Sequence, residues 1–253
     1  MRPIRPICRA FSAGLALALA AAPARADFKV FQPDAEFGET AVEIVGDAGF
    51  DPVSRRDGEQ SFVEEIERGV TPFWRMELEL EADRDAGPDQ PTNFTQFTWE
   101  NVFQLTQPGE YFLDSGFFFE YGQSILPDTP HETTFGPIFR KEIFRTIDTV
   151  NLFFEKDIGS TAGGRLNFSY RWETRIALGT AIEPGFQAYG EPGAFGHFEP
   201  LGQQDHRLGP MLFGTVAVLG PGSLKWNAGV LFGLTPAAPR ETIRWQAEYE
   251  IHF

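Results

Sequence analysis

Charged side chains recur at every second position along several short segments of this chain, with apolar side chains between them. Arg75, Glu77 and Glu79 alternate with Trp74 and Leu78, and the same spacing recurs downstream. A period of two places all the charges of such a segment on one face of a β-strand. Rings of charged groups can select solutes in a channel, whereas facing opposite charges can pair and fill the space between strands.

These charged faces are predicted to surround one lumen of mixed sign. Two alternatives stay open: a polar path whose charges select solutes, or an ion-pair network that closes the barrel. A barrel of about eight strands is filled by side chains, whereas one of about sixteen leaves a channel. The candidate lumen-lining residues are Arg75, Glu77, Glu79, Glu100, Glu120, Arg140, Arg171, Glu173, Arg175, Glu183, Lys225, Arg244 and Glu248.

Catalysis, cofactor binding and metal binding find little support in the sequence. Only one histidine, His252, has an acid two residues away in an expected strand, Glu250. The acidic runs around Asp83 and Asp128 lack the spacing of a calcium loop. We therefore expect no enzyme, no catalytic residue, and no bound cofactor or metal. A lipid-modifying enzyme of the outer membrane is the third alternative, after a channel and a closed structural barrel.

The last segment, residues 241–253, shows the period of two most clearly. Ile243, Trp245 and Tyr249 fall on one face, and Arg244 and Glu248 fall on the other. One apolar and one wholly polar face is typical of a strand between lipid and water. The chain ends on an aromatic residue, as the closing strands of bacterial outer-membrane barrels typically do. The expected signal for the barrel-assembly machinery is therefore Tyr249, Ile251 and Phe253.

About twelve such segments follow one another, each near the length that crosses a bilayer as a tilted strand. The links between them are alternately short and long, as in outer-membrane barrels, where short turns face the periplasm. The sequence predicts an all-β protein, a transmembrane antiparallel up-and-down barrel. The expected strands are residues 38–45, 60–68, 71–82, 96–106, 110–121, 134–144, 150–155, 165–175, 181–191, 206–217, 223–234 and 241–253.

The amino-terminal residues have the pattern of a secretory leader. Arg2, Arg5 and Arg9 precede an apolar run, and Ala24 and Ala26 provide the small residues of a cleavage site. We expect residues 1–26 to be a cleaved signal peptide and residues 38–253 to be the barrel. Residues 27–37 show no clean alternation and are predicted to be either a lumenal plug or a free periplasmic segment.

Composition limits the classes of partner and the chemistry that are expected for this chain. The formal net charge is −15, so nucleic acid is not an expected partner. Outside the leader no apolar run is long enough for a membrane helix, so any membrane residence requires strands. The single cysteine, Cys8, lies in the expected leader, which leaves the mature chain without a disulfide or a cysteine nucleophile.

Aromatic residues fall near the ends of the expected strands. Such residues form interfacial belts in membrane barrels, and we prefer this interpretation to an aromatic binding site. Phe112, Phe118 and Tyr189 are exceptions that fall on polar faces, where they could pack against inward neighbours or bind a hydrophobic solute. The expected belt residues are Trp74, Tyr111 and Trp226 at the inner ends, and Tyr121 and Trp245 at the outer ends.

Several segments resemble a family of proteobacterial outer-membrane barrels described as transporters of the meta-cleavage pathway of phenol degradation. The segments are residues 69–71, 184–191, 206–210, 229–235 and 248–250. The family usually has a glutamate where this chain has Gln187. The resemblance implies a Gram-negative outer-membrane barrel with a transport role, and it carries no functional residues.

Together these observations predict a narrow channel or transporter for small solutes, possible solutes being aromatic or other small organic molecules. The expected partners are outer-membrane lipid, lipopolysaccharide, the barrel-assembly machinery and a small solute. The expected location is the outer membrane of a Gram-negative bacterium.

Overall fold

Twelve antiparallel strands form a closed barrel in the computed structural model, which describes residues 28–217 and 222–252. None of these residues belongs to a helix long and apolar enough to cross a membrane. Two short 3-10 helices, η1 (Ser54–Arg56) and η2 (Leu201–Gln203), lie in links. The strands are β1 (Glu39–Phe50), β2 (Gln60–Thr71), β3 (Trp74–Arg84), β4 (Thr92–Gln104), β5 (Asp114–Ser124), β6 (His131–Ile143), β7 (Thr146–Ile158), β8 (Leu166–Ile176), β9 (Ile182–Ala194), β10 (Asp205–Ala217), β11 (Gly222–Gly233) and β12 (Glu241–His252).

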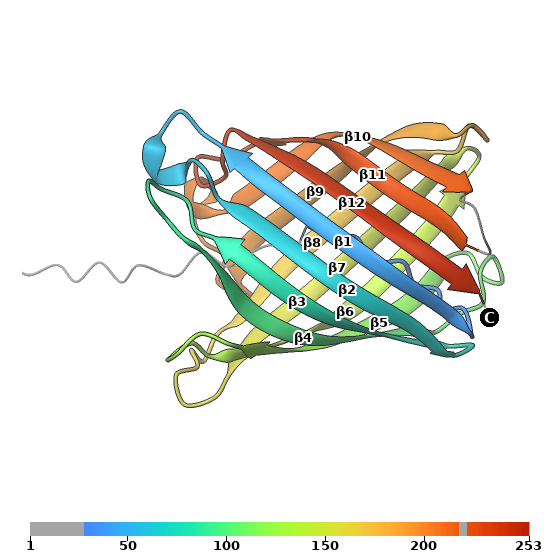
Figure 1. Cartoon of the computed structure of the whole chain (residues 1–253), viewed down its shortest axis with the longest axis horizontal. Helices are drawn as coiled ribbons and strands as arrows, with labels where there is room; N and C mark the ends of the chain where they lie inside the picture. Colours follow the sequence, from blue (N-terminus) through green and yellow to red (C-terminus); the bar gives the residue numbers. More distant parts are fainter. Residues whose placement is uncertain (1–27, 218–221, 253) are drawn as a thin grey trace, which may run out of the picture.

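The barrel closes through β1 and β12, the first and last strands (Figure 1). Val42 lies opposite Tyr249 and Asp47 opposite Arg244 in this antiparallel pair. Every other strand pairs with its two neighbours in sequence. Closure leaves no strand edge unpaired, which is the condition for a β-structure in hydrocarbon. The predicted fold, an up-and-down barrel of about twelve strands, is confirmed.

The outer face of the wall is apolar. Ile66, Phe97 and Leu212 point outwards from β2, β4 and β10, and all three side chains are exposed. The alternate residues point inwards and are mostly polar, as a period of two requires. Glu64 of β2 is an exception, because it lies exposed beside Ile66 on the outer side. A wall with this apolar exterior fits hydrocarbon outside and a polar interior within.

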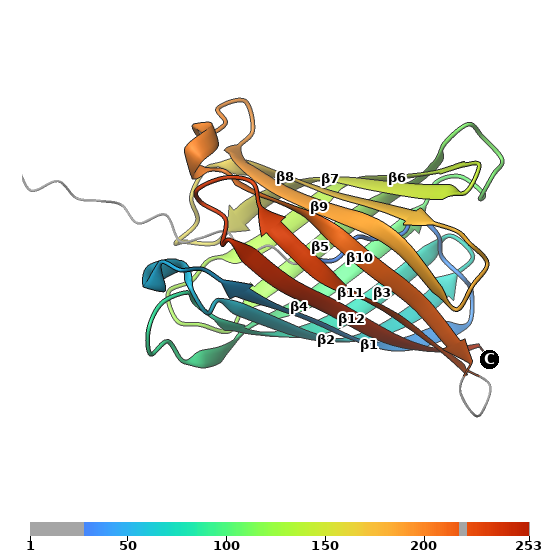
Figure 2. The same cartoon turned by 90° about the horizontal axis from the view of Figure 1, so that it is seen from above.

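The links sort by length between the two ends of the barrel. Residues 51–59, 85–91, 125–130, 159–165, 195–204 and 234–240 connect strands at the end where η1 and η2 lie (Figure 2). The opposite end, where β12 finishes, has the links 72–73, 105–113, 144–145 and 177–181. We call these the long-link end and the short-link end. The link 105–113 is the exception to the sorting.

Several predicted strand boundaries differ from the structure by up to five residues, and one of them misplaces two aromatic residues. The strand expected at residues 110–121 begins only at Asp114, so Tyr111 and Phe112 belong to the preceding link. Gly109 adopts a left-handed conformation with φ 74°, and its amide donates a hydrogen bond to Asp114 Oδ1 at 2.7 Å. The link is therefore longer than the sequence predicted. The prediction was misled because Tyr111 and Phe112 continue the apolar alternation of the strand although they lie outside it.

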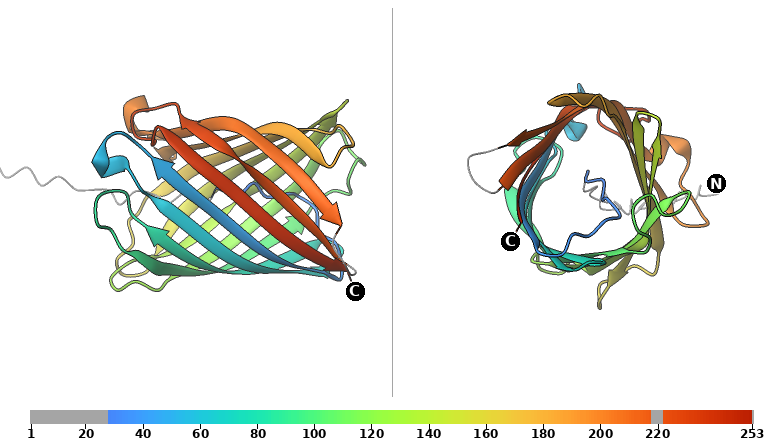
Figure 3. Two further views of the ribbon diagram at one scale, coloured as in Figure 1. Left: turned by 45° about the horizontal axis from the view of Figure 1, so that its top comes forward. Right: turned by 90° about the vertical axis from the view of Figure 1, so that its right-hand side faces the viewer.

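The chain from residue 28 runs inside the barrel, as the view along its axis shows (Figure 3), and reaches the surface at Phe37, which is 67% exposed. Phe28, Val30 and Phe31 are buried there, and the segment joins β1 at the short-link end, where Gly38 N donates to Gly69 O at 3.0 Å. The close approach requires a glycine at position 69, since a Cβ there would lie 1.7 Å from Glu36 O. We call residues 28–37 the lumenal segment. The expected signal peptide, residues 1–26, lies outside the described residues.

Candidate functional site: the lumen and its segment

Two cavities lie in the lumen. A large cavity of about 750 Å³ opens towards the long-link end, because Leu126, Thr129 and Pro130 of the link 125–130 help to line it. A small cavity of about 170 Å³ lies towards the short-link end and is lined in part by Lys29, Phe31 and other residues of the lumenal segment. The lumenal segment therefore lies on the short-link side of the large cavity and narrows the lumen there.

The large cavity is strongly acidic. Arg171 is the one basic residue that lines it among the described residues. Because each acid comes from the inward face of a strand or from the adjoining link, the negative groups surround the cavity on several sides. A low-dielectric wall focuses such a field and concentrates cations in the cavity. The acidic lining residues are Glu79, Glu81, Asp83, Asp85, Glu100, Glu120, Glu132, Glu155, Asp157 and Glu191.

Wall side chains bind the backbone of the lumenal segment at its beginning. Arg244 Nε and Tyr189 Oη both donate to Phe28 O, at 2.6 and 2.8 Å. Arg171 donates to Lys29 O at 2.9 Å. Arg244 has no solvent exposure, and its charge is therefore directed at a carbonyl oxygen within the lumen. The contacts from Arg244 and Arg171 use charged donors, which form stronger hydrogen bonds than neutral ones.

The middle of the segment is held by amide side chains. Asn151 accepts a hydrogen bond from Phe31 N at 2.8 Å and donates one to Phe31 O at 3.0 Å. Further along, Gln104 Oε1 accepts from Ala35 N at 3.0 Å. An extended segment inside a barrel has no neighbouring strand, so its backbone groups need partners of this kind. The side chain of Asn151 thus makes the two hydrogen bonds to Phe31 that a residue of a neighbouring strand would make.

Lys29 places its ammonium group among three buried carboxylates. Its Nζ lies 3.0 Å from Glu43 and 2.5 Å from Glu77, and it also forms an ion pair with Glu65. We call Glu43, Glu65 and Glu77 the cage. Burial by itself lowers the pKa of Lys29, but the surrounding carboxylates outweigh it and raise the pKa well above the ordinary lysine value. Lys29 is therefore a buried cation matched by an excess of acids.

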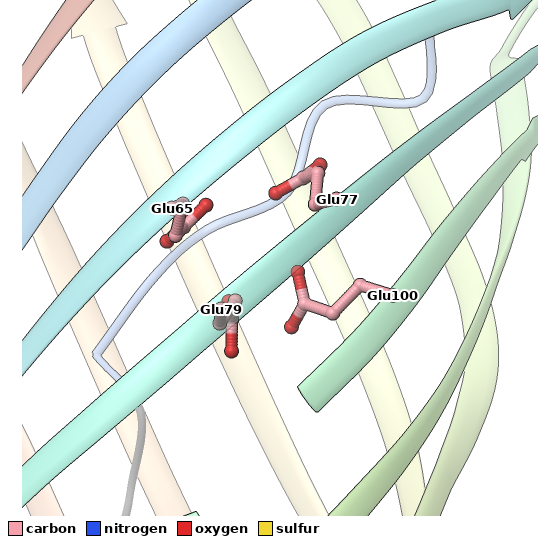
Figure 4. Close-up of side chains that lie close together, drawn as sticks. All are labelled: Glu65, Glu77, Glu79 and Glu100. Carbon is pink, nitrogen blue, oxygen red and sulfur yellow. The ribbon is translucent and has the colours of Figure 1, made fainter. Parts of the chain in front are cut away.

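Two of the cage residues belong to a larger acidic group. Glu65, Glu77, Glu79 and Glu100 each place one carboxylate oxygen within 4.8 Å of the others, and the lumenal segment runs beside them (Figure 4). Two further groups meet the same criterion, namely Glu39 with Glu67 and Glu248, and Glu132 with Glu155 and Asp157. Oxygen ligands of this kind suit hard cations or ammonium groups.

Aromatic rings support the other side of the segment. Phe31 packs against Phe118 with ring centroids 4.3 Å apart, and Phe28 packs edge-on against Tyr189 at 4.9 Å. Phe118 and Tyr189, which the sequence placed on polar faces, thus contact residues of the lumenal segment. Phe112 behaves differently: it is 84% exposed in the link 105–113, with Lys141 Nζ 4.3 Å from its ring centroid.

The remaining lumen candidates form pairs around the wall. Arg140 binds Glu142 at 2.9 Å, and Arg175 lies 3.4 Å from Glu183. Lys225 pairs with Glu250, and Glu248 lines the small cavity. Arg75 binds both Glu67 and Glu77 at 3.2 and 3.0 Å, and it also donates to Asp34 O at 3.1 Å. Glu173 accepts a hydrogen bond from the amide of Gln187 at 2.6 Å.

Sequence analysis missed Lys29, Glu43 and Glu65. Glu65 and Glu67 are two residues apart, which is the signal that could have placed both in the lumen. The adjacent Glu64 hid it by putting a charge on the opposite face. Lys29 had no comparable signal, because its segment is surrounded by the wall and therefore shows no two-sided pattern.

The expected belt and terminal residues lie mainly on outward faces. Trp74 stacks on Phe103 at 6.3 Å, and Trp245 packs near Phe62 at 5.8 Å. The expected belt residue Tyr111 lies in the link 105–113 and is exposed. The remaining positions are Trp226 beside Gly214, Tyr121 near His131, Tyr249 opposite Leu224, and Ile251 opposite Gly222, whereas Phe253 lies outside the described residues.

No protein-family model and no curated protein sequence matches the chain. Solved structures similar to it include CdiB from Escherichia coli, at 8% identity and a TM-score of 0.45, with 85% of this chain and 63% of CdiB covered. A bacterial polysaccharide outer membrane secretin has 10% identity and a TM-score of 0.43, covering 86% and 99%. LpxR from Salmonella typhimurium has 7% identity and a TM-score of 0.41, covering 85% and 100%. Similarity at this level carries no argument about activity.

Proposed function

We propose that this chain is an outer-membrane barrel of a Gram-negative bacterium that passes small solutes through its lumen. The observation that carries the proposal is the large cavity of about 750 Å³ inside a wall with an apolar exterior. A barrel filled by its own side chains leaves no such space. The volume falls within the range of about 300–1,000 Å³ that small-molecule sites usually have.

Passage requires the lumenal segment to move. Phe28, Val30 and Phe31 are buried in the lumen, and hydrogen bonds hold the backbone of Phe28 and Phe31 to the wall. The segment forms no strand, and it joins the barrel only through β1. It can therefore leave the lumen without breaking any strand pairing of the barrel.

Link lengths support an orientation. Long links face the exterior in outer-membrane barrels and short turns face the periplasm, so the large cavity opens to the outside of the cell. Lipopolysaccharide then surrounds the long-link end, and the closing strand, with Tyr249, Ile251 and Phe253, engages the barrel-assembly machinery. The resemblance to meta-pathway phenol transporters, and with it an aromatic or other small organic solute, stays a prediction.

Single-channel recording in planar bilayers tests this function. We expect the full mature chain to conduct weakly or intermittently, and a variant lacking residues 28–37 to conduct several times more. Deleting residues 201–203, which form η2 outside the lumen, is the matched control and leaves conductance unchanged. Circular dichroism and heat-modifiable gel mobility verify that each barrel is folded. If neither the chain nor the deletion variant conducts, and neither passes solutes in liposome swelling, the channel function is wrong.

A closed structural barrel is the second candidate, and the contacts of the lumenal segment favour it. Asn151, Arg171 and Arg244 all bind the backbone of this segment, while three carboxylates hold Lys29. A permanently docked segment predicts the same negligible conductance at every voltage and in every solute. Conductance of the unmodified chain distinguishes the two candidates, because only a channel needs the segment to leave, whereas the deletion variant is expected to conduct in both cases.

A further inference from the structure

An ammonium group already binds acids that adjoin the floor of the large cavity. Lys29 Nζ lies 2.5 Å from Glu77 and is paired with Glu65, and both residues belong to the group that also contains Glu79 and Glu100. Glu79 and Glu100 line the large cavity, whereas Lys29 lines the small one. The same acidic group is thus accessible to a solute from one side and occupied by the chain's own ammonium group from the other.

A second observation points to an additional ligand at this group. Glu65 Oε1 is buried and has no hydrogen-bond partner among the described residues, although the other oxygen of Glu65 binds Lys29. The side chain of Glu65 is 1% exposed. A buried carboxylate oxygen without a donor is costly, so an N–H group that passes Glu79 and Glu100 from the large cavity would find an acceptor here.

The far end of the same cavity has a second acidic group. Glu132, Glu155 and Asp157 each place one oxygen within 4.8 Å of the others, and all three line the large cavity near the long-link end. A single divalent metal ion uses only one of the two groups. A flexible chain with several ammonium groups uses both at once, and linking two binding events raises the affinity well above that of either alone.

The lining also favours an organic cation over a bare ion. Val63, Leu126 and Tyr189 contribute apolar surface between the acids. At the floor, Lys29 Nζ itself lies 4.9 Å from the ring centroid of Phe31, a distance at which an ammonium group is attracted to an aromatic face. Methylene groups of a polyamine would contact the apolar surface while its ammonium groups contact the acids.

We propose that the large cavity binds linear polyamines, and that a bound polyamine takes Glu65 and Glu77 from Lys29 and thereby releases the lumenal segment. The chain carries its own competitor for the site in Lys29. Only the consequence of this release, an open lumen through which the cation passes, rests on the proposed function. The binding itself stands apart from conduction and is measured separately.

Isothermal titration of the full mature chain in detergent, at physiological ionic strength, tests the binding. We expect spermidine to bind, and Lys29→Gln to bind it about tenfold more tightly because the tethered competitor is gone. Lys141→Gln removes the same charge from the outer face and changes the affinity less than about twofold. The double variant Glu132→Gln/Asp157→Asn weakens spermidine about tenfold but leaves butylamine, which has one ammonium group, unchanged.

Hydrogen exchange of the unmodified chain tests the release without any substitution. Saturating spermidine is expected to raise exchange at the amides of Phe31 and Ala35 at least tenfold, because both are hydrogen-bonded only while the segment is docked. Butylamine at the same concentration has a smaller effect. Unchanged exchange in saturating spermidine would overturn the release.

Three further results would overturn the inference. One is Mg²⁺ binding that is as tight as spermidine binding and competes with it, which would make the site a metal site. Another is an equal gain in affinity from Lys29→Gln and Lys141→Gln, which would reduce the effect to overall charge. The third is no heat of binding for any variant. If spermidine binds and releases the segment but no variant conducts, the proposed channel function fails and this inference stands.

Discussion

The two cavities of the lumen differ in the balance of acidic and basic residues that line them. In the small cavity, bases stand next to acids: Arg75 binds Glu67, and Lys225 pairs with Glu250. In the large cavity, Arg171 is the one basic residue among the described lining residues, and it also contacts the lumenal segment. The first pattern is that of a structure held together by ion pairs. The second leaves a net negative field that acts on solutes.

Lys29 lies where the two patterns meet. It provides a positive charge to the acidic floor, and it belongs to a segment that no strand pairing holds. Replacing one partner of a buried ion pair leaves the others uncompensated, whereas exposed pairs contribute little. The role of Lys29 can therefore be tested by comparing it with Lys225, a second lysine that lines the small cavity and pairs with an acid there.

The largest effect is expected for Lys29→Met. Removing this buried cation should cost the docked state of the lumenal segment about 3–5 kcal/mol. Exchange at the amides of Phe31 and Ala35 should then rise by about 100-fold or more. Lys225→Met is the matched control, and because its side chain is 51% exposed it should change the same exchange little. Equal effects of the two substitutions would show that Lys29 does not hold the segment.

A smaller effect is expected for Gly69→Ala. The new Cβ would lie 1.7 Å from Glu36 O, so the end of the lumenal segment must shift away from β2. We expect single-channel conductance to rise severalfold while the barrel stays folded. Gly122→Ala is the control, because its Cβ would meet only the end of the Gln96 side chain, which can move. Equal conductance of the two variants would show that the position of the lumenal segment does not limit conduction.

The smallest effect is expected for ion selectivity. In the variant lacking residues 28–37, Glu120→Gln removes one charge from the large cavity and should reduce the preference for cations by less than about twofold. Glu142→Gln removes one charge at the other end, from a residue that is 63% exposed and paired with Arg140, and should have less effect. Reversal potentials in a salt gradient measure both. A larger shift for Glu142→Gln would contradict the assignment of the selective field to the large cavity.

Sequence patterns were reliable where the chain faces two different surroundings. In β12, Ile243 and Arg244 alternate because one face meets hydrocarbon and the other meets the lumen, so each residue type reports its own side. The pattern failed in the link 105–113, where Tyr111 and Phe112 extend the apolar character of β5 but follow a left-handed Gly109. The alternation of apolar and polar residues alone does not detect a turn of this kind.

The lumenal segment shows why the candidate site was only partly predictable. The acids Glu77, Glu79 and Glu100 were identified from their spacing, but the group that occupies them was not. Phe31 meets Asn151 across 120 residues of sequence, and Phe28 meets Arg244 across 216. No local period encodes such pairings, because they exist only after the barrel has closed around the segment.

What the amino-acid sequence determined by itself was the wall: twelve alternating segments, an apolar exterior, a charged interior and links of two lengths. These follow from the two-residue repeat of a strand, which each segment expresses on its own. Only the tertiary structure decided what fills the lumen. The position of Lys29 among Glu43, Glu65 and Glu77, and the separation of an acidic cavity from a charge-paired one, depend on closure between β1 and β12. Closure brings together charges whose interaction falls off with distance in space, irrespective of their separation along the chain.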